Sequence, residues 1–222
     1  MSAARLLRPL PASEARALLE ARGVRFPRGE DVRDASSVAA AARGLRPPFV
    51  VKLLSPAVVH KTEHGAVRLG LESAEAAAEA ACAMEKALHR NIPGTLLDGF
   101  RVEEQAPAPL AELLVGGIRD EAFGPAVTFG AGGVAVELLD DARWRLAPLV
   151  NGDARDAVRS SRVFPLLDGW RGRPRADLEA LERVLDAVAR LLVEEPRIVE
   201  VDLNPVFAYP DLALAVDARV LA

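Results

Sequence analysis

The chain has 222 residues, half of them hydrophobic, which is enough to bury a sizeable core in one domain or two small lobes. Its 28 basic and 32 acidic residues give a net charge of -4, which excludes a general electrostatic affinity for nucleic acid or for an anionic membrane. The single cysteine allows no intramolecular disulfide, which is typical of a reducing compartment. The sequence shows neither a signal peptide nor a run of about 18 apolar residues that could span a membrane. We therefore expect a cytoplasmic protein.

Apolar spacing and turn residues predict helices and strands that alternate along the chain. In chain order, the predicted elements are a helix from a Ser13 cap to Gly23, a strand at Val24–Phe26, a helix from Ser36 or Ser37 to Gly44, a strand at Phe49–Leu54, a helix at Ser73–Arg90, strands at Phe100–Glu104, Ala111–Ile118, Ala126–Phe129 and Val134–Leu139, a helix beginning at Asn151 or Asp153, a long helix with an apolar stripe from Leu178 to Leu192, and strands at Glu200–Pro205 and Ala215–Arg219. This order favours an α/β or α+β class with a mixed sheet. We expect Cys82 to be a buried residue of its helix.

Lys52 interrupts an otherwise apolar predicted strand, Phe49–Leu54. A buried ammonium group without an anion costs several kcal/mol, so this side chain must either reach the sheet surface or meet an anion. A nucleotide phosphate would satisfy the second condition, and the exposed face of a half-buried strand would satisfy the first.

The loop after this strand holds two of the three histidines, His60 and His64. Imidazole can accept a phosphoryl group or transfer protons near neutral pH. Lys61 and the backbone N–H groups around Gly65 could receive the charge of a phosphoryl group. For His64 we favour a local hydrogen bond, and we do not expect a zinc site because no thiolate or third histidine lies at ligand spacing.

A glycine-rich run, Gly130–Gly133, separates two predicted strands. It matches neither the dinucleotide nor the P-loop motif, because no helix pattern begins directly after it, and tight hairpins use glycine for the same backbone reasons. Glu137, Asp141 and Arg145 follow at even spacing. Arg145 could meet a phosphate, and a surface hairpin with ion pairs is the alternative.

Two apolar segments near the carboxyl end carry oxygen donors, Asn204 in the first and Asp217 in the second. Mg²⁺ is held by one or two carboxylate or amide oxygens together with nucleotide phosphates. Asn204 and Asp217 are therefore candidate metal ligands, and the alternative is a pair of hairpin strands whose acids cap turns.

Eight ordered motifs are similar to one family, and the match runs from about residue 12 to the carboxyl end. They are Val51–Pro56 with His60–Thr62, Val67–Leu71, Val102–Glu104, Phe123–Pro125, Phe129–Gly133, Arg145–Leu149, Asp202–Pro205 and Val216–Arg219. Together they resemble the ATP-grasp, or beta, subunit or domain of NDP-forming acyl-CoA synthetases, a group that includes ADP-forming acetate-CoA ligase and is related to succinyl-CoA synthetase.

The resemblance implies an α+β ATP-grasp fold for residues 1–222 as a single domain. Residues 24–105 would form a smaller N-terminal lobe. Residues 106–222 would form a C-terminal lobe, with residues 1–23 packed on it. A cleft between the lobes would hold ATP or ADP with Mg²⁺. The residues that match nucleotide-binding positions are Lys52, Ser55, Glu104, Glu112, Gly130, Gly132 and Gly133. Asn204 and Asp217 match the metal ligands, and His60, Lys61 and Arg145 are placed at the transferred phosphoryl group.

In this family an acyl-CoA and phosphate give an acyl phosphate on a CoA-binding alpha part, a histidine there takes up the phosphoryl group, and the grasp domain passes it to ADP. His60 matches the histidine thought to relay that group. Because the chain holds nothing similar to a CoA-binding segment, the resemblance implies a separate alpha subunit in a hetero-oligomer, or a homodimer when the chain is isolated.

One departure from the family is Gly65-Ala66 in place of a Gly-Gly pair, where a Cβ could restrict the histidine loop.

Two alternative functions are possible for a chain of this fold. One is a non-catalytic grasp-fold protein for nucleotide binding, regulation or assembly, and the other is a carboxylate-amine ligase. The intact set of phosphate-binding groups and metal ligands argues against the first, and the His60-Lys61 pair argues against the second.

Overall fold

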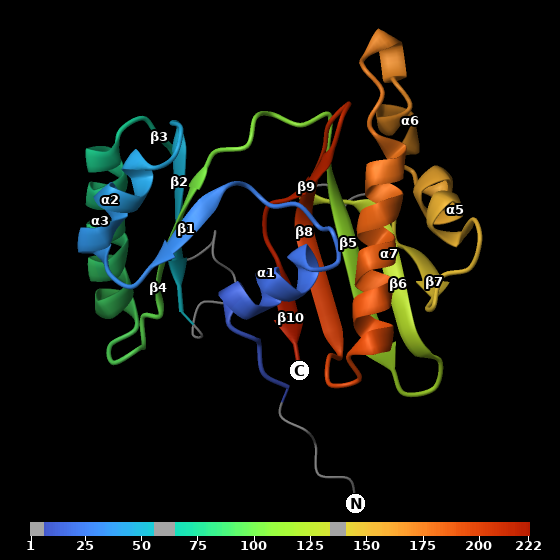
Figure 1. The fold of residues 1–222 in the computed structure, drawn as a ribbon, viewed down its shortest axis with the longest axis horizontal. Helices are drawn as coiled ribbons and strands as arrows, with labels where there is room; N and C mark the ends of the chain where they lie inside the picture. The colour runs from blue at the N-terminus through green and yellow to red at the C-terminus, as the bar shows by residue number, and fades with distance from the viewer. Residues whose placement is uncertain (1–6, 56–64, 134–140) are drawn as a thin grey trace, which may run out of the picture. The chain divides into compact units, whose positions relative to one another are not determined.

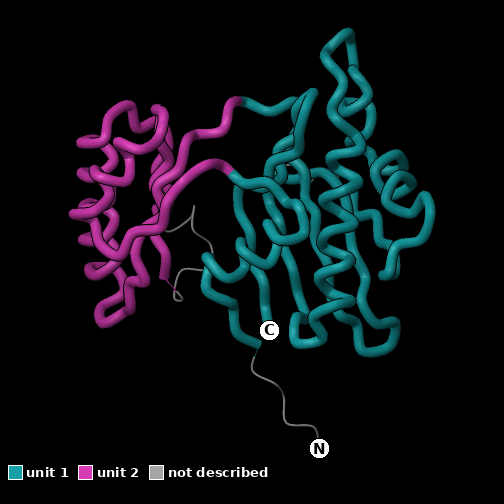
Figure 2. The backbone as a smooth tube through the Cα atoms, viewed as in Figure 1, with its two compact units in different colours: residues 1–26, 108–222 teal, residues 27–107 magenta. Residues whose placement is uncertain are grey.

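The computed structural model describes residues 7–55, 65–133 and 141–222, which fall into two compact units (Figure 2). The smaller unit is residues 27–107, and the larger unit joins residues 1–26 to residues 108–222. Each unit has its own sheet and its own cluster of buried apolar side chains. In the described ranges, no helix is both long and apolar enough to cross a membrane.

The smaller unit is built on a four-stranded antiparallel sheet in the order β1-β4-β2-β3. Its strands are β1 (Gly29–Val32), β2 (Phe49–Leu54), β3 (Val67–Leu71) and β4 (Gly99–Glu104), and its helices are the short 3-10 helix η1 (Ala35–Ser37), α2 (Val38–Arg43) and α3 (Ala74–Asn91). The helices lie together beside the sheet (Figure 1). Alternate strand residues, Phe49, Val51 and Leu53 among them, pack under these helices, so the residues between them belong to the other face.

Helix α3 begins as the sequence predicts, because the Ser73 side chain accepts a hydrogen bond from the Ala76 N–H at 3.1 Å. Its buried stripe consists of Ala77, Ala81, Met84 and Leu88. Cys82 lies beside this stripe and is exposed, so its predicted burial is wrong.

The larger unit is built on a six-stranded sheet in the order β10-β8-β5-β6-β7, with β9 paired to β8. Its strands are β5 (Ala111–Asp120), β6 (Gly124–Ala131), β7 (Arg143–Leu146), β8 (Glu200–Ala208), β9 (Ala213–Ala215) and β10 (Arg219–Leu221), and its helices are α1 (Ala12–Glu20), α5 (Asp153–Ser160), α6 (Phe164–Leu167), the 3-10 helix η3 (Trp170–Gly172) and α7 (Leu178–Glu194). Helices α1, α5 and α7 contribute to one core on the same face of this sheet (Figure 1).

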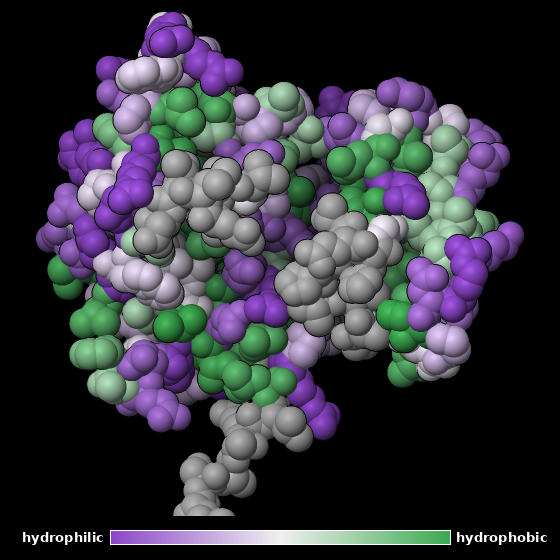
Figure 3. Space-filling view, turned by 180° about the vertical axis from the view of Figure 1, so that it is seen from behind, coloured by the Kyte–Doolittle hydropathy of each residue, from purple (hydrophilic) through white to green (hydrophobic). Residues whose placement is uncertain are grey.

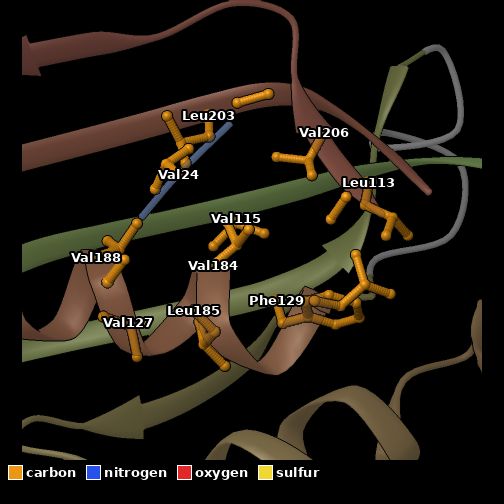
Figure 4. Close-up of a cluster of buried hydrophobic side chains, with 14 of the residues drawn as sticks. Val24, Leu113, Val115, Val127, Phe129, Val184, Leu185, Val188, Leu203 and Val206 are labelled. Carbon is orange, nitrogen blue, oxygen red and sulfur yellow. The ribbon is translucent and has the colours of Figure 1, made fainter. Parts of the chain in front are cut away.

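The long helix α7 organises that core. The Asp177 side chain caps it by accepting a hydrogen bond from the Ala180 N–H at 2.9 Å. The predicted apolar stripe is confirmed, since its members from Leu181 to Leu192 are buried against strands β5, β6 and β8. Figure 4 shows side chains of α7 and of these strands pointing toward one another.

Three predictions from the sequence need revision. Helix α1 begins at Ala12 after Pro11, so Ser13 lies inside it and does not cap it. Val24–Phe26 is not a strand: Val24 is buried in the core of the larger unit, and the Arg25 carbonyl accepts a hydrogen bond from the Ala215 N–H. The strand predicted at Ala215–Arg219 is instead divided between the ends of β9 and β10, with no strand at 216–218.

The strand predicted at 134–139 lies outside the described residues, so this prediction is not tested.

Candidate functional site

Lys52 is buried on the helix-free face of the smaller sheet, with 6% of its surface exposed. Its ammonium group forms an ion pair with the carboxylate of Glu103, which is itself 1% exposed. The second oxygen of Glu103 accepts a hydrogen bond from the Arg101 Nε at 3.0 Å, and Arg101 Nη1 reaches Asp31 Oδ1 at 2.7 Å. The alternative of a lysine on an exposed strand face is therefore wrong, and the chain itself supplies an anion for Lys52.

Glu104 ends strand β4, one residue after Glu103. Strand alternation places its side chain on the face opposite to Lys52, level with Phe49. Its carboxylate accepts a hydrogen bond from the Arg46 N–H at 3.2 Å and lies 3.7 Å from the Arg28 guanidinium. The structure thus places the two predicted nucleotide contacts, Lys52 and Glu104, on different faces of one sheet.

The histidine loop begins directly after strand β2. Ser55 donates a hydrogen bond from its hydroxyl to the Leu96 carbonyl at 2.6 Å. The two candidate catalytic residues His60 and Lys61 lie outside the described residues. At the far end of the loop Gly65 has a φ of 64°, and Ala66 is buried in the core of the smaller unit. The methyl group that departs from the family pattern therefore has a packing role here.

The glycine turn lies against strands β5 and β8 of the larger unit. The Gly132 N–H donates to the Glu112 carbonyl at 2.8 Å, and the Gly133 N–H donates to Asn204 Oδ1 at 3.3 Å. A Cβ at Gly132 would overlap the backbone of Leu113, and at Gly133, where φ is 59°, it would overlap the Glu112 carboxylate. Close backbone approach thus requires glycine at both positions, and it brings Glu112, Gly133 and Asn204 together.

Asn204, one of the two metal candidates, lies on the helix-free face of the larger sheet. Along β8 the core side chains Val201 and Leu203 alternate with Glu200, Asp202 and Asn204, which therefore share the other face. Figure 3 views the molecule from the side opposite to Figure 1.

Asp202 is a further candidate for this site, and the sequence did not single it out. Burial raises the pKa of its carboxyl group, the Arg219 guanidinium opposes that effect, and the Glu200 and Asp217 carboxylates raise the pKa further. Asp217, which lies between β9 and β10, is therefore close enough to Asp202 for their charges to interact. The signal in the sequence was the spacing of two residues from Asp202 to Asn204, which places both on one face of a strand.

These donors fit a hard divalent cation. Asn204 offers an amide oxygen, and Asp202 and Asp217 offer carboxylates whose mutual repulsion a cation would offset. Within residues 7–55, 65–133 and 141–222, no group of three or more His, Cys, Asp or Glu side chains is arranged to hold a metal on its own. Mg²⁺ usually keeps water and phosphate oxygens among its ligands, so it does not require such a group.

Arg145 belongs to the opposite face of the same sheet. It pairs in register with Val127, whose side chain is in the core under the helices, and its Nη1 donates to the Trp144 carbonyl at 2.8 Å. The structure therefore does not place Arg145 on the face that carries Asn204.

The neighbouring Asp141 is a buried structural residue. It accepts hydrogen bonds from the N–H groups of Arg162 at 2.6 Å and Val163 at 3.0 Å. A Cβ at Gly130 would overlap its backbone carbonyl, so Gly130 is required for close packing. Asp141 thus anchors the segment before α6, and its carboxylate also lies 3.4 Å from the Arg143 guanidinium.

A family model described as "ATP-grasp domain" matches residues 3–221 of this chain. The beta subunit of ADP-forming acetate-CoA ligase I from Pyrococcus furiosus is 36% identical over 214 residues, which cover 96% of this chain and 92% of that protein. The family inferred from the sequence motifs and the mixed helix and sheet architecture are both confirmed.

Solved structures of ADP-forming acetyl-CoA synthetases are also similar to this chain. The dinucleotide-forming acetyl-coenzyme A synthetase 1 of Ca. Korarchaeum cryptofilum, in complex with coenzyme A, Ca-AMPCP and HgCl+, superposes with a TM-score of 0.91 at 36% identity, covering 96% of this chain and 93% of that chain. A second structure of that enzyme, with coenzyme A and Mg-AMPPCP and with a phosphohistidine segment pointing towards the nucleotide-binding site, gives a TM-score of 0.83 at 34% identity, covering 96% of this chain and 92% of that chain.

Proposed function

This chain belongs to the ATP-grasp domain family, and from that premise we propose that it is the nucleotide-binding beta subunit of an ADP-forming acyl-CoA synthetase, a ligase that joins an acid to a thiol. One observation carries the proposal: the chain matches a beta subunit of an ADP-forming acetate-CoA ligase over 92% of that protein's length. The reaction assigned to this subunit is transfer of a phosphoryl group from a phosphohistidine to ADP, which gives histidine and ATP, or the reverse.

The phosphate-binding role falls to Lys52 and the glycine turn. Phosphoryl transfer has a loose transition state whose charge is stabilised by cations and by backbone N–H groups. Lys52 is a buried cation, and the turn from Gly130 to Gly133 brings backbone close to Glu112 and Asn204. Glu104 is assigned to the adenosine part and Ser55 to the phosphate side of the nucleotide.

Mg²⁺ is assigned to Asn204 and Asp217, with Asp202 beside them. When bound, the ion would neutralise charge on the phosphates and orient them. The supporting observation is chemical, since all three side chains offer oxygen and two of them are carboxylates whose charges interact. The Mg-AMPPCP complex of the Korarchaeum enzyme is consistent with this assignment.

His60 and Lys61 remain the proposed catalytic pair, with His60 relaying the phosphoryl group and Lys61 balancing its charge. The phosphohistidine segment in the related enzyme supports a histidine relay in this family. Arg145 stays a proposed phosphate contact, but its place on the helix face of the sheet makes it the weakest of the three.

A separate CoA-binding alpha subunit is the proposed partner, in a hetero-oligomer. The name of the Pyrococcus protein, a subunit beta, supports a divided enzyme. The sites for the acid and for coenzyme A would then lie on that partner.

Calorimetric titration with Mg-ADP and Mg-ATP tests the proposal. We expect micromolar to millimolar dissociation constants for the wild type and at least about tenfold weaker binding for Asp217→Ala, because a carboxylate ligand of the metal is lost. The matched control is Asp211→Ala, which removes an exposed carboxylate from the same part of the chain and should bind like the wild type. No binding of either nucleotide at millimolar concentration contradicts the proposal and leaves a non-catalytic scaffold as the better description.

A further inference from the structure

The segment between α6 and α7 projects from the larger unit (Figure 1, orange, above the label α6). Its base is closed by a hydrogen bond from the Ala176 N–H to the Leu167 carbonyl at 2.8 Å, and both of these residues are buried. Between them lie residues 168–175, here called the tip, which are exposed except for the half-buried Gly169. The base therefore belongs to the core of the unit, and the tip belongs to its surface.

The backbone of the tip is held in a conformation that costs free energy. Arg171 has a φ of 54° and a ψ of 37°, and among the residues that the structure describes it is the one non-glycine residue with a positive φ. The nearby Gly169 and Gly172 also have positive φ values, 91° and 78°. Glycine adopts this backbone freely, whereas the Cβ of any other residue crowds its own carbonyl. A strained residue that glycine could replace without strain points to a task for its side chain.

The tip presents tryptophan and arginine side chains to solvent. Trp170 is 53% exposed, and the Arg171 guanidinium lies 5.9 Å from the centroid of its ring. Arg175 pairs with Asp168 at 3.4 Å, but within the described part of the chain neither Arg171 nor Arg173 forms an ion pair. Tryptophan and arginine are enriched among the residues that dominate the affinity of protein interfaces. The tip thus combines an apolar anchor with two cations that carboxylates of a partner would neutralise.

The tip projects from the end of the larger sheet that carries the glycine turn. At its base the Asp177 N–H donates to the Tyr209 carbonyl at 2.9 Å, directly after strand β8 ends. Two residues earlier, Phe207 of β8 pairs in register with Glu112, whose carbonyl accepts the hydrogen bond from Gly132. A protein that brings a phosphoryl group to the glycine turn therefore approaches this end of the sheet.

We propose that the tip is a docking element for the CoA-binding alpha subunit, with Trp170 inserted in an apolar pocket of that subunit and with Arg171 and Arg173 facing its carboxylates. This inference rests on the proposed function, in which the phosphoryl group reaches this chain from that subunit. A nucleic acid is the less favoured partner, because the chain has a net charge of -4 and the tip has a single aromatic side chain on which bases could stack.

The experiment measures binding of the full chain to the alpha subunit of the same organism by biolayer interferometry, at low and at high salt. For Trp170→Ala we expect a dissociation constant at least about tenfold larger, because the anchor is lost. For Arg173→Glu we expect about tenfold weaker binding at low salt and a smaller effect at high salt, because the reversed charge repels the partner's carboxylates and salt screens that repulsion.

Arg171→Gly separates docking from folding. Glycine accepts the positive φ without strain, so the melting temperature of this variant should not fall. The dissociation constant for the alpha subunit should nevertheless rise by about fivefold, because the guanidinium is lost. A merely structural role for Arg171 predicts the opposite, a lower melting temperature with unchanged affinity.

Two variants outside the tip are matched controls. Trp144 is 46% exposed on β7, at the edge of the larger sheet, and Arg155 is exposed on α5. Trp144→Ala and Arg155→Glu make the same chemical changes as the two tip variants and should bind the alpha subunit like the wild type. If Trp144→Ala weakens binding and Trp170→Ala does not, the docking surface is the edge of the sheet, and the inference is overturned.

Folded Trp170→Ala and Arg173→Glu variants with wild-type affinity also overturn the inference. So does a wild type that binds a single-stranded RNA oligonucleotide more tightly than it binds the alpha subunit. Calorimetry with Mg-ADP keeps the two proposals apart, because each tip variant should bind Mg-ADP like the wild type. A wild type that binds Mg-ADP but not the alpha subunit contradicts docking through the tip, whereas failure to bind Mg-ADP counts against the proposed function.

Discussion

In the smaller unit the buried charges of the helix-free sheet face are paired with one another, whereas in the larger unit carboxylates gather on the corresponding face. Lys52, Arg101, Glu103 and Asp31 give two charges of each sign.

Around Asp202, the carboxylates of Glu200 and Asp217 raise the pKa of its carboxyl group, and the Arg219 guanidinium lowers it. Carboxylates that raise one another's pKa would be stabilised by a divalent cation. The two antiparallel sheets therefore differ in how their polar faces handle charge: one pairs opposite charges, and the other brings like charges together.

Removing the internal partner should break the balance of the smaller unit. We expect Glu103→Ala to lower the free energy of unfolding by about 3–5 kcal/mol, because it leaves the buried Lys52 and Arg101 without their shared carboxylate. Urea unfolding followed by circular dichroism measures this loss.

The control is Asp31→Ala, whose more exposed ion pair should contribute about 1 kcal/mol or less. Equal losses for the two variants would show that burial does not set the strength of these pairs.

A second variant tests whether backbone packing, and not charge, shapes the larger unit's site. Gly132→Ala should cost about 1–3 kcal/mol and weaken Mg-ADP binding, since the new methyl group overlaps the Leu113 backbone. Thermal unfolding and calorimetry give the two effects.

Gly44→Ala is the comparison, because φ there is -82° and its nearest contact, the Ala41 carbonyl, lies at 3.4 Å. Its stability should change by no more than about 0.5 kcal/mol. Were Gly132→Ala equally mild, the close approach at the glycine turn would not matter.

The smallest effect concerns the unbalanced carboxylates. Burial raises the pKa of Asp202, so the folded chain holds this proton to higher pH than the unfolded chain does. Protonated Asp202 therefore contributes to the free energy of unfolding at pH values below about 3.9, the pKa of an aspartate in the unfolded chain. This contribution is lost as the pH rises through the higher pKa of Asp202 in the folded chain. Asp202→Asn should therefore raise the melting temperature of the nucleotide-free protein at neutral pH by about 2 °C, with a smaller gain near pH 4.

Differential scanning fluorimetry at both pH values checks this expectation, and added Mg-ADP should stabilise the wild type more than the variant. Glu200→Gln is the counterpart, because Glu200 pairs with Arg219 and should bring no such gain. A lower melting temperature for Asp202→Asn at neutral pH would contradict this expectation. It would mean that interactions other than those with Glu200, Asp217 and Arg219 stabilise the Asp202 carboxylate in the folded protein.

The sequence predicted those elements whose signals are local. The apolar stripe of α7 repeats at helical spacing, and the helix predicted at Ser73–Arg90 corresponds to α3, so both were found. The strand expected at Val24–Phe26 failed because an apolar triplet can also pack as a single extended segment, and only the rest of the larger unit decides which. The family was predictable because eight motifs in fixed order carry far more information than any one of them.

For the site, spacing in the sequence showed which residues carry charge but not which side chains meet. The sequence left Lys52 either on the exposed face of a strand or beside an anion. The structure pairs it with Glu103, which lies 51 positions away and is reached only through the register of β2 with β4. The face of the sheet that carries Arg145 could not be predicted for the same reason, since it depends on the pairing of β7 with β6.

Exposure of Cys82 on α3 has a practical consequence. It is the only cysteine among the 222 residues, it lies outside the buried stripe of its helix, and it belongs to the smaller unit. A maleimide dye would therefore attach at one defined position without any prior removal of other thiols. Fluorescence anisotropy of that dye would then report the tumbling and local mobility of one half of the molecule as nucleotide is added.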